Sequence, residues 1–436
     1  MSSPRAPEKI FPSGEATFQS LCGNLFQENF FWRDFGKRQE CRFPESSALF
    51  FDAMKIGILT QPLHTNYGGL LQAFALQKFL RDMGHEALTV DYARRARPWL
   101  APYYFARRCV GKFLLGRGGP LFPKPPAAGA GRHTARFVAE NVRTTRRLAA
   151  PARSRDFAEY AFDAFVVGSD QTWRPAYSPH MPTFFLDFLA ADDARTRRVA
   201  YAASFGTDAW EFSPELTRAC APLAKRFHAV SVREDSGVAL CEKFLGVRAE
   251  HLLDPTLLLD AADYRAVVDR DEARGLLEKR VPARRVFAYV LDASAEKSAA
   301  VARVAETLGA ETEEIMPPAA ALRAGTAAFP PVSAWLRGFR DAEFVVTDSF
   351  HGCVFSIVFD RPFLALGNAA RGMARFSSLL RQFGLEERLV SPEALAALPR
   401  ERFAALLAAS PDWARVNAVR SREILRSRAF LERALA

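Results

Sequence analysis

Residues 54–83, MKIGILTQPLHTNYGGLLQAFALQKFLRDM, carry the pattern that decides the fold. Residues 55–60 form a short apolar run of strand length, and a polar loop follows over residues 61–69. The apolar residues of 70–83 then recur at helical spacing, and Gly84 fits the position just past a helix end. The stretch therefore predicts a strand, a loop and a helix, the opening unit of an α/β domain.

Strands and helices continue to alternate after this unit, which is typical of a parallel sheet covered by helices on both faces. The series starts twice, before and after a charged helical stretch at residues 264–279. The sequence therefore predicts the α/β class, with two Rossmann-like domains facing a cleft. The further predicted strands are residues 87–92, 164–167, 198–203, 229–232, 249–253, 285–291, 343–346 and 363–366.

The domain organisation follows from the same pattern. Residues 1–53 show no helical or strand period, and we expect a disordered leader or a start site placed upstream of the natural one at Met54. A Pro- and Gly-rich basic insertion interrupts the first series. The predicted parts are an N-terminal Rossmann-like domain at 54–270 with the insertion at 94–132, a C-terminal Rossmann-like domain at 280–405, and a helical tail at 406–436.

Composition narrows the possible partners. The formal charge of +10 attracts anions such as phosphorylated substrates or acidic lipid headgroups, although solvated basic faces would give the same count. No recognisable nucleic-acid module accompanies the charge, which argues against nucleic acid. Six cysteines without a CxxC pair argue against zinc and disulfides and favour a reducing, cytoplasmic compartment. No apolar run approaches the roughly 20 residues that span a bilayer.

Polar loops at predicted strand ends are the candidate sites, because ligands of open parallel sheets bind beyond the carboxyl ends of the strands. In Thr347–Gly352, Ser349 or His351 near a helix N-terminus could bind an anion, or could simply cap and pack. In Gly168–Trp173, Asp170 and Gln171 could orient sugar hydroxyls and Trp173 could stack on a sugar ring. The alternative for this loop is a turn with a core tryptophan.

Two further loops extend the candidate site. In Ser231–Asp235, Arg233 offers a planar fork suited to phosphate or carboxylate, unless it forms an ion pair with a neighbouring acid. Thr65–Gly69 resembles a phosphate-binding turn, but it is neither GxGxxG nor a Walker motif.

These loops, taken in order, resemble the polysaccharide pyruvyl transferase family. The resemblance covers roughly residues 54–390. It implies a GT-B-like fold in which donor and acceptor meet between the two domains. The implied donor is phosphoenolpyruvate, and the implied acceptor, on the N-terminal side, is a sugar or a lipid-linked glycan. The reaction would then take place at the cytoplasmic face of the membrane. The motifs that carry it are Thr65–Gly69 with Leu71–Gln77, Gly168–Trp173, Ala203–Gly206, Ser231–Glu234, Asp254–Leu258 and Thr347–Gly352, with Arg371, Gly372, Arg375 and Phe376 behind them.

Transfer of a pyruvyl unit needs cations for a phosphate and a carboxylate, an acid for the CH2 carbon and a base for the incoming hydroxyl. We hypothesise that Arg233 neutralises the donor's charge, that His351 binds its phosphate or supplies the proton, and that Asp170 orients or deprotonates the acceptor. No step demands a metal or a cofactor. The predicted substrate-binding residues are Asn66, Tyr67, Gly68, Ser169, Gln171, Trp173, Ser204, Ser349 and Arg375.

Two other functions remain open at this point. A glycosyltransferase could use the same two-domain fold with a nucleotide sugar, since fold alone does not separate donors. A non-catalytic assembly protein could bind acidic glycan or the membrane surface through its arginines. The sequence sets neither the acceptor sugar and its linkage, nor the oligomeric state, nor whether residues 94–132 form a lid.

Overall fold

The computed structural model describes residues 53–93, 129–178, 180–280, 283–367 and 373–436, together with residues 102, 105, 106, 109 and 110. The predicted leader up to residue 52 and most of the predicted basic insertion lie outside these residues, as do Arg371 and Gly372.

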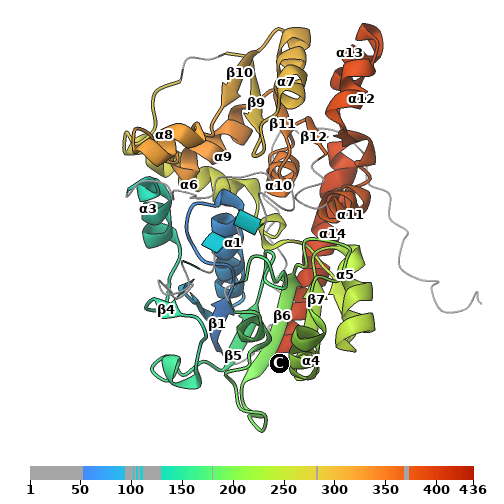
Figure 1. The fold of residues 1–436 in the computed structure, drawn as a ribbon. Coiled ribbons are helices and arrows are strands. Elements are labelled where there is room, and N and C mark those ends of the chain that lie inside the picture. Colours follow the sequence, from blue (N-terminus) through green and yellow to red (C-terminus); the bar gives the residue numbers. More distant parts are fainter. Residues whose placement is uncertain are drawn as a thin grey trace, which may run out of the picture. The chain divides into compact units, whose positions relative to one another are not determined.

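A six-stranded parallel sheet forms the first half of the described chain (Figure 1). Its order is β2-β1-β5-β6-β7-β8, so the strand order reverses beside β1, and the loops after β1 and β5 flank this switch point. The strands are β1 Lys55–Leu59, β2 Glu86–Thr89, β5 Ala164–Val167, β6 Arg197–Ala203, β7 Ala229–Val232 and β8 Glu250–His251. A separate two-stranded sheet pairs β3 Tyr92–Ala93 with β4 Leu148–Ala149.

A five-stranded parallel sheet forms the second half, in the order β10-β9-β11-β12-β13. Here the order reverses beside β9, and the loop after β11 therefore lies at the second switch point. The strands are β9 Arg285–Tyr289, β10 Glu311–Glu314, β11 Phe344–Thr347, β12 Phe363–Leu366 and β13 Leu389–Val390.

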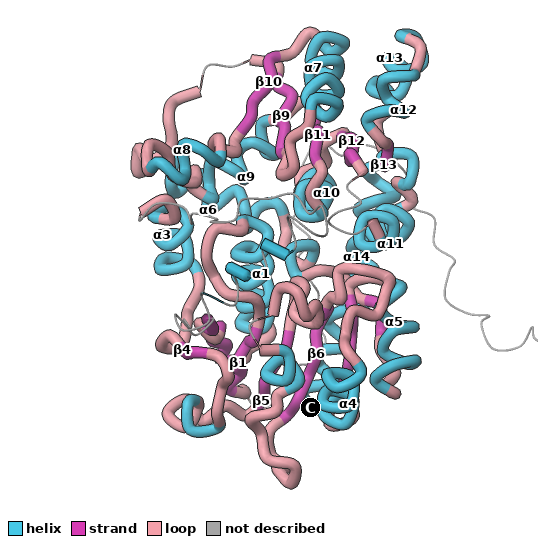
Figure 2. The backbone as a smooth tube through the Cα atoms, in the orientation of Figure 1, coloured by secondary structure: helices cyan, strands magenta, loops and turns pink. Residues whose placement is uncertain are grey.

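Helices connect the strands and cover the sheets, and the loops at the strand ends lie between the two sheets (Figure 2). The last helix, α14, returns to the first sheet, where Phe430 contacts Tyr201 of β6 with ring centroids 6.2 Å apart. The helices are α1 Tyr67–Asp82, α3 Arg132–Asn141, α4 Pro214–Ala224, α5 Asp235–Leu240, α6 Ala261–Ala273, α7 Ala295–Leu308, α8 Ala319–Ala324, α9 Val332–Asp341, α10 Phe350–Val358, α11 Ala374–Phe383, α12 Pro392–Ala397, α13 Arg400–Ala408 and α14 Trp413–Leu435.

Alternation along the strands distributes the apolar side chains over three buried clusters. In β5, Val166 faces the first cluster and Val167 the second; in β11, Val345 faces the first cluster and Val346 the third. The first cluster therefore lies against one face of each sheet, and we call it the shared core. Trp335 of α9 is fully buried within it.

The two parallel sheets confirm the predicted α/β class with two Rossmann-like domains. Details of the elements differ. The helix predicted at 70–83 begins at Tyr67, because the Asn66 side chain caps it by accepting from the Gly69 N–H (3.3 Å). The strand predicted at 87–92 divides into β2 and β3, because β3 leaves the main sheet to pair with β4. The exact domain boundaries stay a prediction.

Candidate active site

His351 lies in the first turn of α10, and the residues around it explain that position. β11 ends at Thr347, whose hydroxyl donates to the Tyr289 carbonyl (2.7 Å) and accepts from the Ser349 N–H (3.1 Å). Gly352 lets the helix start against this strand end, because a Cβ there would lie 2.1 Å from the Thr347 hydroxyl oxygen. Ser349 is the N-cap residue. The Thr-Asp-Ser-Phe-His-Gly sequence thus sets a helix directly on the end of β11.

The imidazole of His351 packs against the first turn of α1. A Cβ at Gly68 would lie 2.0 Å from Nδ1 of this ring, so the close approach of the two helices requires glycine. Helix N-termini carry free N–H groups and partial positive charge. The first turns of a 16-residue and a 9-residue helix therefore meet at His351, an arrangement that favours an anion.

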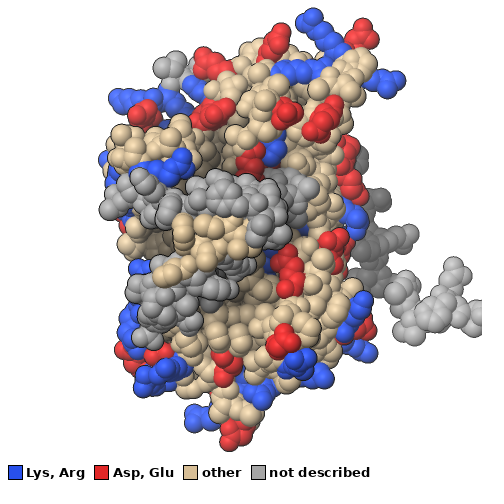
Figure 3. All heavy atoms as spheres, viewed as in Figure 1, with Lys and Arg blue, Asp and Glu red and all other residues tan. Residues whose placement is uncertain are grey.

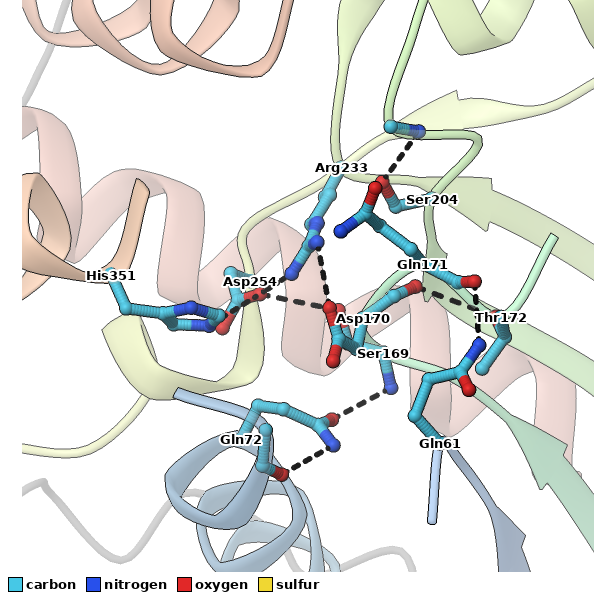
Figure 4. Close-up of polar contacts among 12 residues, drawn as sticks. Gln61, Gln72, Ser169, Asp170, Gln171, Thr172, Ser204, Arg233, Asp254 and His351 are labelled. Carbon is cyan, nitrogen blue, oxygen red and sulfur yellow. Dashed lines mark hydrogen bonds and ion pairs between the residues drawn. The ribbon is translucent and has the colours of Figure 1, made fainter. Parts of the chain in front are cut away.

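Arg233 is buried between two carboxylates (Figure 4). Its Nη1 donates to Oδ2 of Asp254 (2.6 Å) and its Nη2 donates to Oδ1 of Asp170 (3.1 Å). The guanidinium side chain has no exposed surface. Two acids that follow other strands already compensate the charge of Arg233, and the guanidinium holds them in place. This pairing does not favour direct neutralisation of the donor by Arg233, which stays a prediction.

Asp254 links this ion pair to His351. Its Oδ2 lies 3.8 Å from Nε2 of His351, and Nε2 is buried without a hydrogen-bond partner among the described residues. Burial lowers the pKa of His351 to about 4, against the opposing effect of the Asp254 carboxylate. His351 is therefore neutral at pH 7. The structure thus brings together the imidazole and the guanidinium that the sequence placed on opposite sides of the site.

Arg375 of α11 supplies a second buried cation. It is 6% exposed, and burial followed by the charge of Arg233 lowers its pKa to about 10, so it remains protonated at neutral pH. The Phe350 ring lies under both cations, 4.7 Å from the Arg233 guanidinium carbon and 5.7 Å from that of Arg375. Phe350 therefore positions the two arginines beside the start of α10.

Several predicted binding residues hold the loops instead. Ser169 is fully buried, and its hydroxyl donates to the Ala202 carbonyl (2.8 Å) and lies 3.2 Å from Oδ2 of Asp254. Ser204 is also fully buried and accepts from the Gly206 N–H (3.0 Å). Their direct contact with substrate is a prediction that this burial does not favour.

Gln171 is a half-buried residue of the same region. Its backbone carbonyl accepts from Nε2 of Gln61 (2.7 Å), and its side-chain oxygen accepts from Arg174 (3.0 Å). Asn66 is exposed beside the start of α1. For Gln171, Asn66 and Ser349, substrate binding stays a prediction.

The packing of Trp173 and Tyr67 does not favour their predicted roles in substrate binding. Trp173 is fully buried, stacks on Phe185 (centroids 4.9 Å apart, rings inclined by 9°) and donates to the Phe184 carbonyl (3.1 Å), so both its ring and its indole N–H are already engaged. Tyr67 is 1% exposed and stacks on Trp335, and its hydroxyl donates to the backbone carbonyl of Pro330, just before α9 (2.9 Å). Both aromatic rings stabilise cores, because their polar atoms find backbone partners there.

Three residues of the site escaped prediction. The Asp254–Leu258 motif gives Asp254 no role by itself, yet this carboxylate lies beside both Arg233 and His351. Gln72 of α1 accepts from the Ser169 N–H (3.0 Å) and donates to the Thr60 hydroxyl (2.7 Å), which fixes the loop after β5. His64 is exposed and interacts electrostatically with Asp170. A buried polar residue on an apolar helix face was the available signal for Gln72.

The two parallel sheets, with a buried ionisable cluster at their carboxyl ends, define a GT-B-like α/β protein. The sequence model of the polysaccharide pyruvyl transferase family matches residues 66–369, which is most of the chain. The chain therefore belongs to the polysaccharide pyruvyl transferase family, and the resemblance stated from its motifs is confirmed. Membership makes it a transferase of polysaccharide biosynthesis.

Comparison with solved structures finds distant likenesses. A glycosyltransferase from Rickettsia africae has 9% identity and a TM-score of 0.44, with 88% of this chain and 96% of that chain covered. The UDP-GlcNAc 2-epimerase of Methanocaldococcus jannaschii has 10% identity and a TM-score of 0.47, with 82% and 93% covered. These scores carry no functional argument. No match was found among curated proteins.

Proposed function

We propose that this chain transfers the pyruvyl group of phosphoenolpyruvate to a sugar of a surface polysaccharide or of its lipid-linked precursor. The observation that carries the proposal is the meeting of two helix N-termini at a buried, neutral His351. Family membership supports the transferase chemistry. The donor, the acceptor and the cytoplasmic setting at the membrane face are parts of the proposal.

The donor site is built for a small molecule with two anionic ends. The helix starts offer backbone N–H groups, and Arg375 adds a charged guanidinium close by. His351 lies at these helix starts, and its Nε2 has no hydrogen-bond partner in the part of the chain that the structure describes. A phosphate dianion placed here would favour the imidazolium form, because an opposite charge nearby raises the pKa of a histidine. Binding of the donor phosphate therefore favours the protonated form of His351, which can then act as the acid.

In the reaction, His351 gives its proton to the CH2 carbon of phosphoenolpyruvate, and positive charge develops at carbon 2. A sugar hydroxyl attacks carbon 2 and its proton passes to Asp170. Phosphate then leaves with the electron pair of its C–O bond, and a second hydroxyl closes the ketal and passes its proton to the departing phosphate. Asp170 follows β5 at the switch point of the first sheet and has a left-handed backbone (φ 61°), which aims its carboxylate at α1.

Arg233 acts in this scheme as a positioning residue. It fixes the carboxylates of Asp170 and Asp254 at 3.1 and 2.6 Å, so the acceptor base and the partner of His351 keep a constant separation. The described residues contain no group of three or more His, Cys, Asp or Glu able to hold a metal ion. The proposed chemistry uses only protons and fixed charges, so neither metal nor cofactor has a part in it.

On the face shown in Figure 3, acidic and basic side chains are interspersed over the described surface. Within the described part of the chain, no helix is long and apolar enough to cross a membrane. A lipid-linked acceptor would therefore be reached by contact at the membrane surface, which we propose for this chain.

The test is to incubate the protein with phosphoenolpyruvate and candidate glycans and to measure phosphate release together with the pyruvyl mass gain. We expect His351→Asn to lower turnover by about 100-fold or more. His228→Asn is the matched control, because His228 lies before β7, where its Nδ1 accepts from the Arg198 N–H (3.0 Å).

Product formation from a nucleotide sugar, without use of phosphoenolpyruvate, would replace the proposal by glycosyl transfer. Salt-sensitive glycan binding without any donor-dependent product would support an assembly protein instead. Unchanged turnover in a folded His351→Asn variant would remove the imidazole from the mechanism.

A further inference from the structure

Asp254 lies at the contact between the two halves of the site. Its Oδ1 accepts from the N–H (3.0 Å) and the hydroxyl (2.6 Å) of Thr256, which fixes the orientation of the carboxylate. Its Oδ2 accepts from Arg233 (2.6 Å) and lies 3.2 Å from the Ser169 hydroxyl. The same oxygen faces Nε2 of His351 at 3.8 Å, which is too long for a hydrogen bond.

In this geometry Nε2 of His351 and Oδ2 of Asp254 face each other without forming a hydrogen bond. The Nε2 atom is buried and unpartnered among the described residues, and the nearest carboxylate oxygen is already present and fixed. A shift of less than 1 Å would bring the two atoms within hydrogen-bond distance. A neutral imidazole gains little from this shift, whereas an imidazolium would gain a charge-assisted bond.

The charges that face His351 act in opposite directions. Asp254 and Asp170 favour the imidazolium, whereas Arg233 and Arg375 oppose it. The first turns of α1 and α10 act in the same direction as the arginines. An added anion would tip this balance toward protonation, because it screens the arginines and the helix ends together.

We propose that the site binds its anion together with a proton taken from solvent, that this proton resides on His351, and that Asp254 is the positioning residue that accepts the new N–H. The identity of the anion, phosphoenolpyruvate, rests on the proposed function. In this imidazolium Asp254 accepts the Nε2–H, and the Nδ1–H, beside Gly68 at the start of α1, is the proton that the CH2 carbon requires. Asp254 therefore couples donor binding to the protonation of His351.

Calorimetric titration of the full chain with phosphoenolpyruvate, in buffers of different ionisation enthalpy, measures the proton uptake. The titrations run from pH 6 to pH 9, and at pH 8 the phosphate ester is already fully ionised in solution. We expect the wild-type protein to take up close to one proton per site at neutral pH. His351→Asn should bind phosphoenolpyruvate without uptake.

Asp254→Asn tests the positioning role. It removes the carboxylate and leaves Arg233 less compensated, and both changes lower the proton affinity of His351. We expect the midpoint of uptake against pH to fall by at least about one unit, a tenfold change in proton affinity. Asp271→Asn is the matched control. Asp271 of α6 is a buried carboxylate that pairs with Arg136 of α3 (2.8 Å), and its loss should leave the midpoint of uptake unchanged.

Arg233→Gln should shift the midpoint of proton uptake in the opposite direction. It removes a positive charge that opposes the imidazolium and leaves Asp254 with Thr256, Ser169 and the imidazole as its neighbours. The uptake midpoint should therefore rise, a result that general damage to the site would not produce. This variant decides the role of Asp254 if Asp254→Asn does not fold, and an unchanged or lower midpoint overturns that role.

The outcomes separate the two proposals. If phosphoenolpyruvate does not bind, the proposed function fails. If it binds to the wild-type protein without proton uptake, or if His351→Asn retains the uptake, the inference about His351 and Asp254 is wrong while the proposed function stands.

Discussion

Gly68→Ala is the substitution whose effect follows most directly from the geometry. The added Cβ would lie 2.0 Å from Nδ1 of His351, whereas real contacts of this kind stay beyond 3.0 Å. The imidazole must therefore move by about 1 Å, a displacement that can reduce turnover by about 100-fold when the displaced group takes part in the reaction. We expect a loss of this size in kcat/KM for phosphoenolpyruvate.

Stability should move much less. Alanine is better than glycine in a helix by up to about 1 kcal/mol, which offsets part of the clash. The assay is steady-state phosphate release beside a thermal melt. Gly69→Ala is the control in the same helical turn, because its Cβ would meet the nearest atom, Oδ2 of Asp170, at an ordinary 3.4 Å.

Two results would refute the reasoning. A folded Gly68→Ala protein with wild-type kcat/KM would show that the position of the imidazole does not matter. Equal losses in Gly68→Ala and Gly69→Ala would show that any added bulk at the start of α1 blocks the substrate, whatever happens to His351.

Three further substitutions or conditions test other parts of the structure. Because the pKa of His351 is about 4 in the folded protein against 6.5 unfolded, the unfolded state binds more protons between these values, and stability should fall by about 3 kcal/mol as pH drops from 6.5 to 4. Chemical denaturation at several pH values measures this loss, and His351→Asn should lack it. Trp173→Phe should lower the free energy of unfolding by about 1–3 kcal/mol through the lost bond to the Phe184 carbonyl, with acceptor KM unchanged; a raised KM would restore the sugar-stacking role. Lys297→Met removes the ion pair of Lys297 with the buried carboxylate of Asp348 (2.7 Å) and should cost about 3–5 kcal/mol in urea unfolding. A neutral effect would show that other donors to this carboxylate, such as the Leu291 and Asp292 N–H groups (2.6 and 3.1 Å), suffice.

The strands and helices were largely predictable because their apolar residues follow simple periods. The strand at 164–167 and the helix at the chain's end came out as expected. The short β8 did not: five apolar-rich residues were expected, but only Glu250 and His251 pair with β7, since the chain turns away at Leu252 to reach the centre of the site. Periodicity indicates that a residue can adopt a strand conformation, whereas its pairing depends on an adjacent strand in the folded sheet.

The site was predictable in its parts and not in its pairings. The loop of His351 follows a strand at a switch point, so its location could be inferred. The partner of Arg233 could not, because Asp254 lies 21 residues further along and no spacing rule links them. Trp173 shows the converse: a tryptophan after a strand end looks the same whether it faces solvent or, as here, stacks on Phe185.

The shared core has a mechanical consequence. Tyr67 from the first half stacks on Trp335 from the second with centroids 5.6 Å apart, and Tyr289 meets the same indole edge-on at 5.2 Å. A rotation of one sheet away from the other would pull Tyr67 away from Trp335 and Tyr289 and expose these rings to water. The described chain should therefore melt in a single cooperative step, and substrates should reach His351 by rearrangement of loops and not by separation of the two halves.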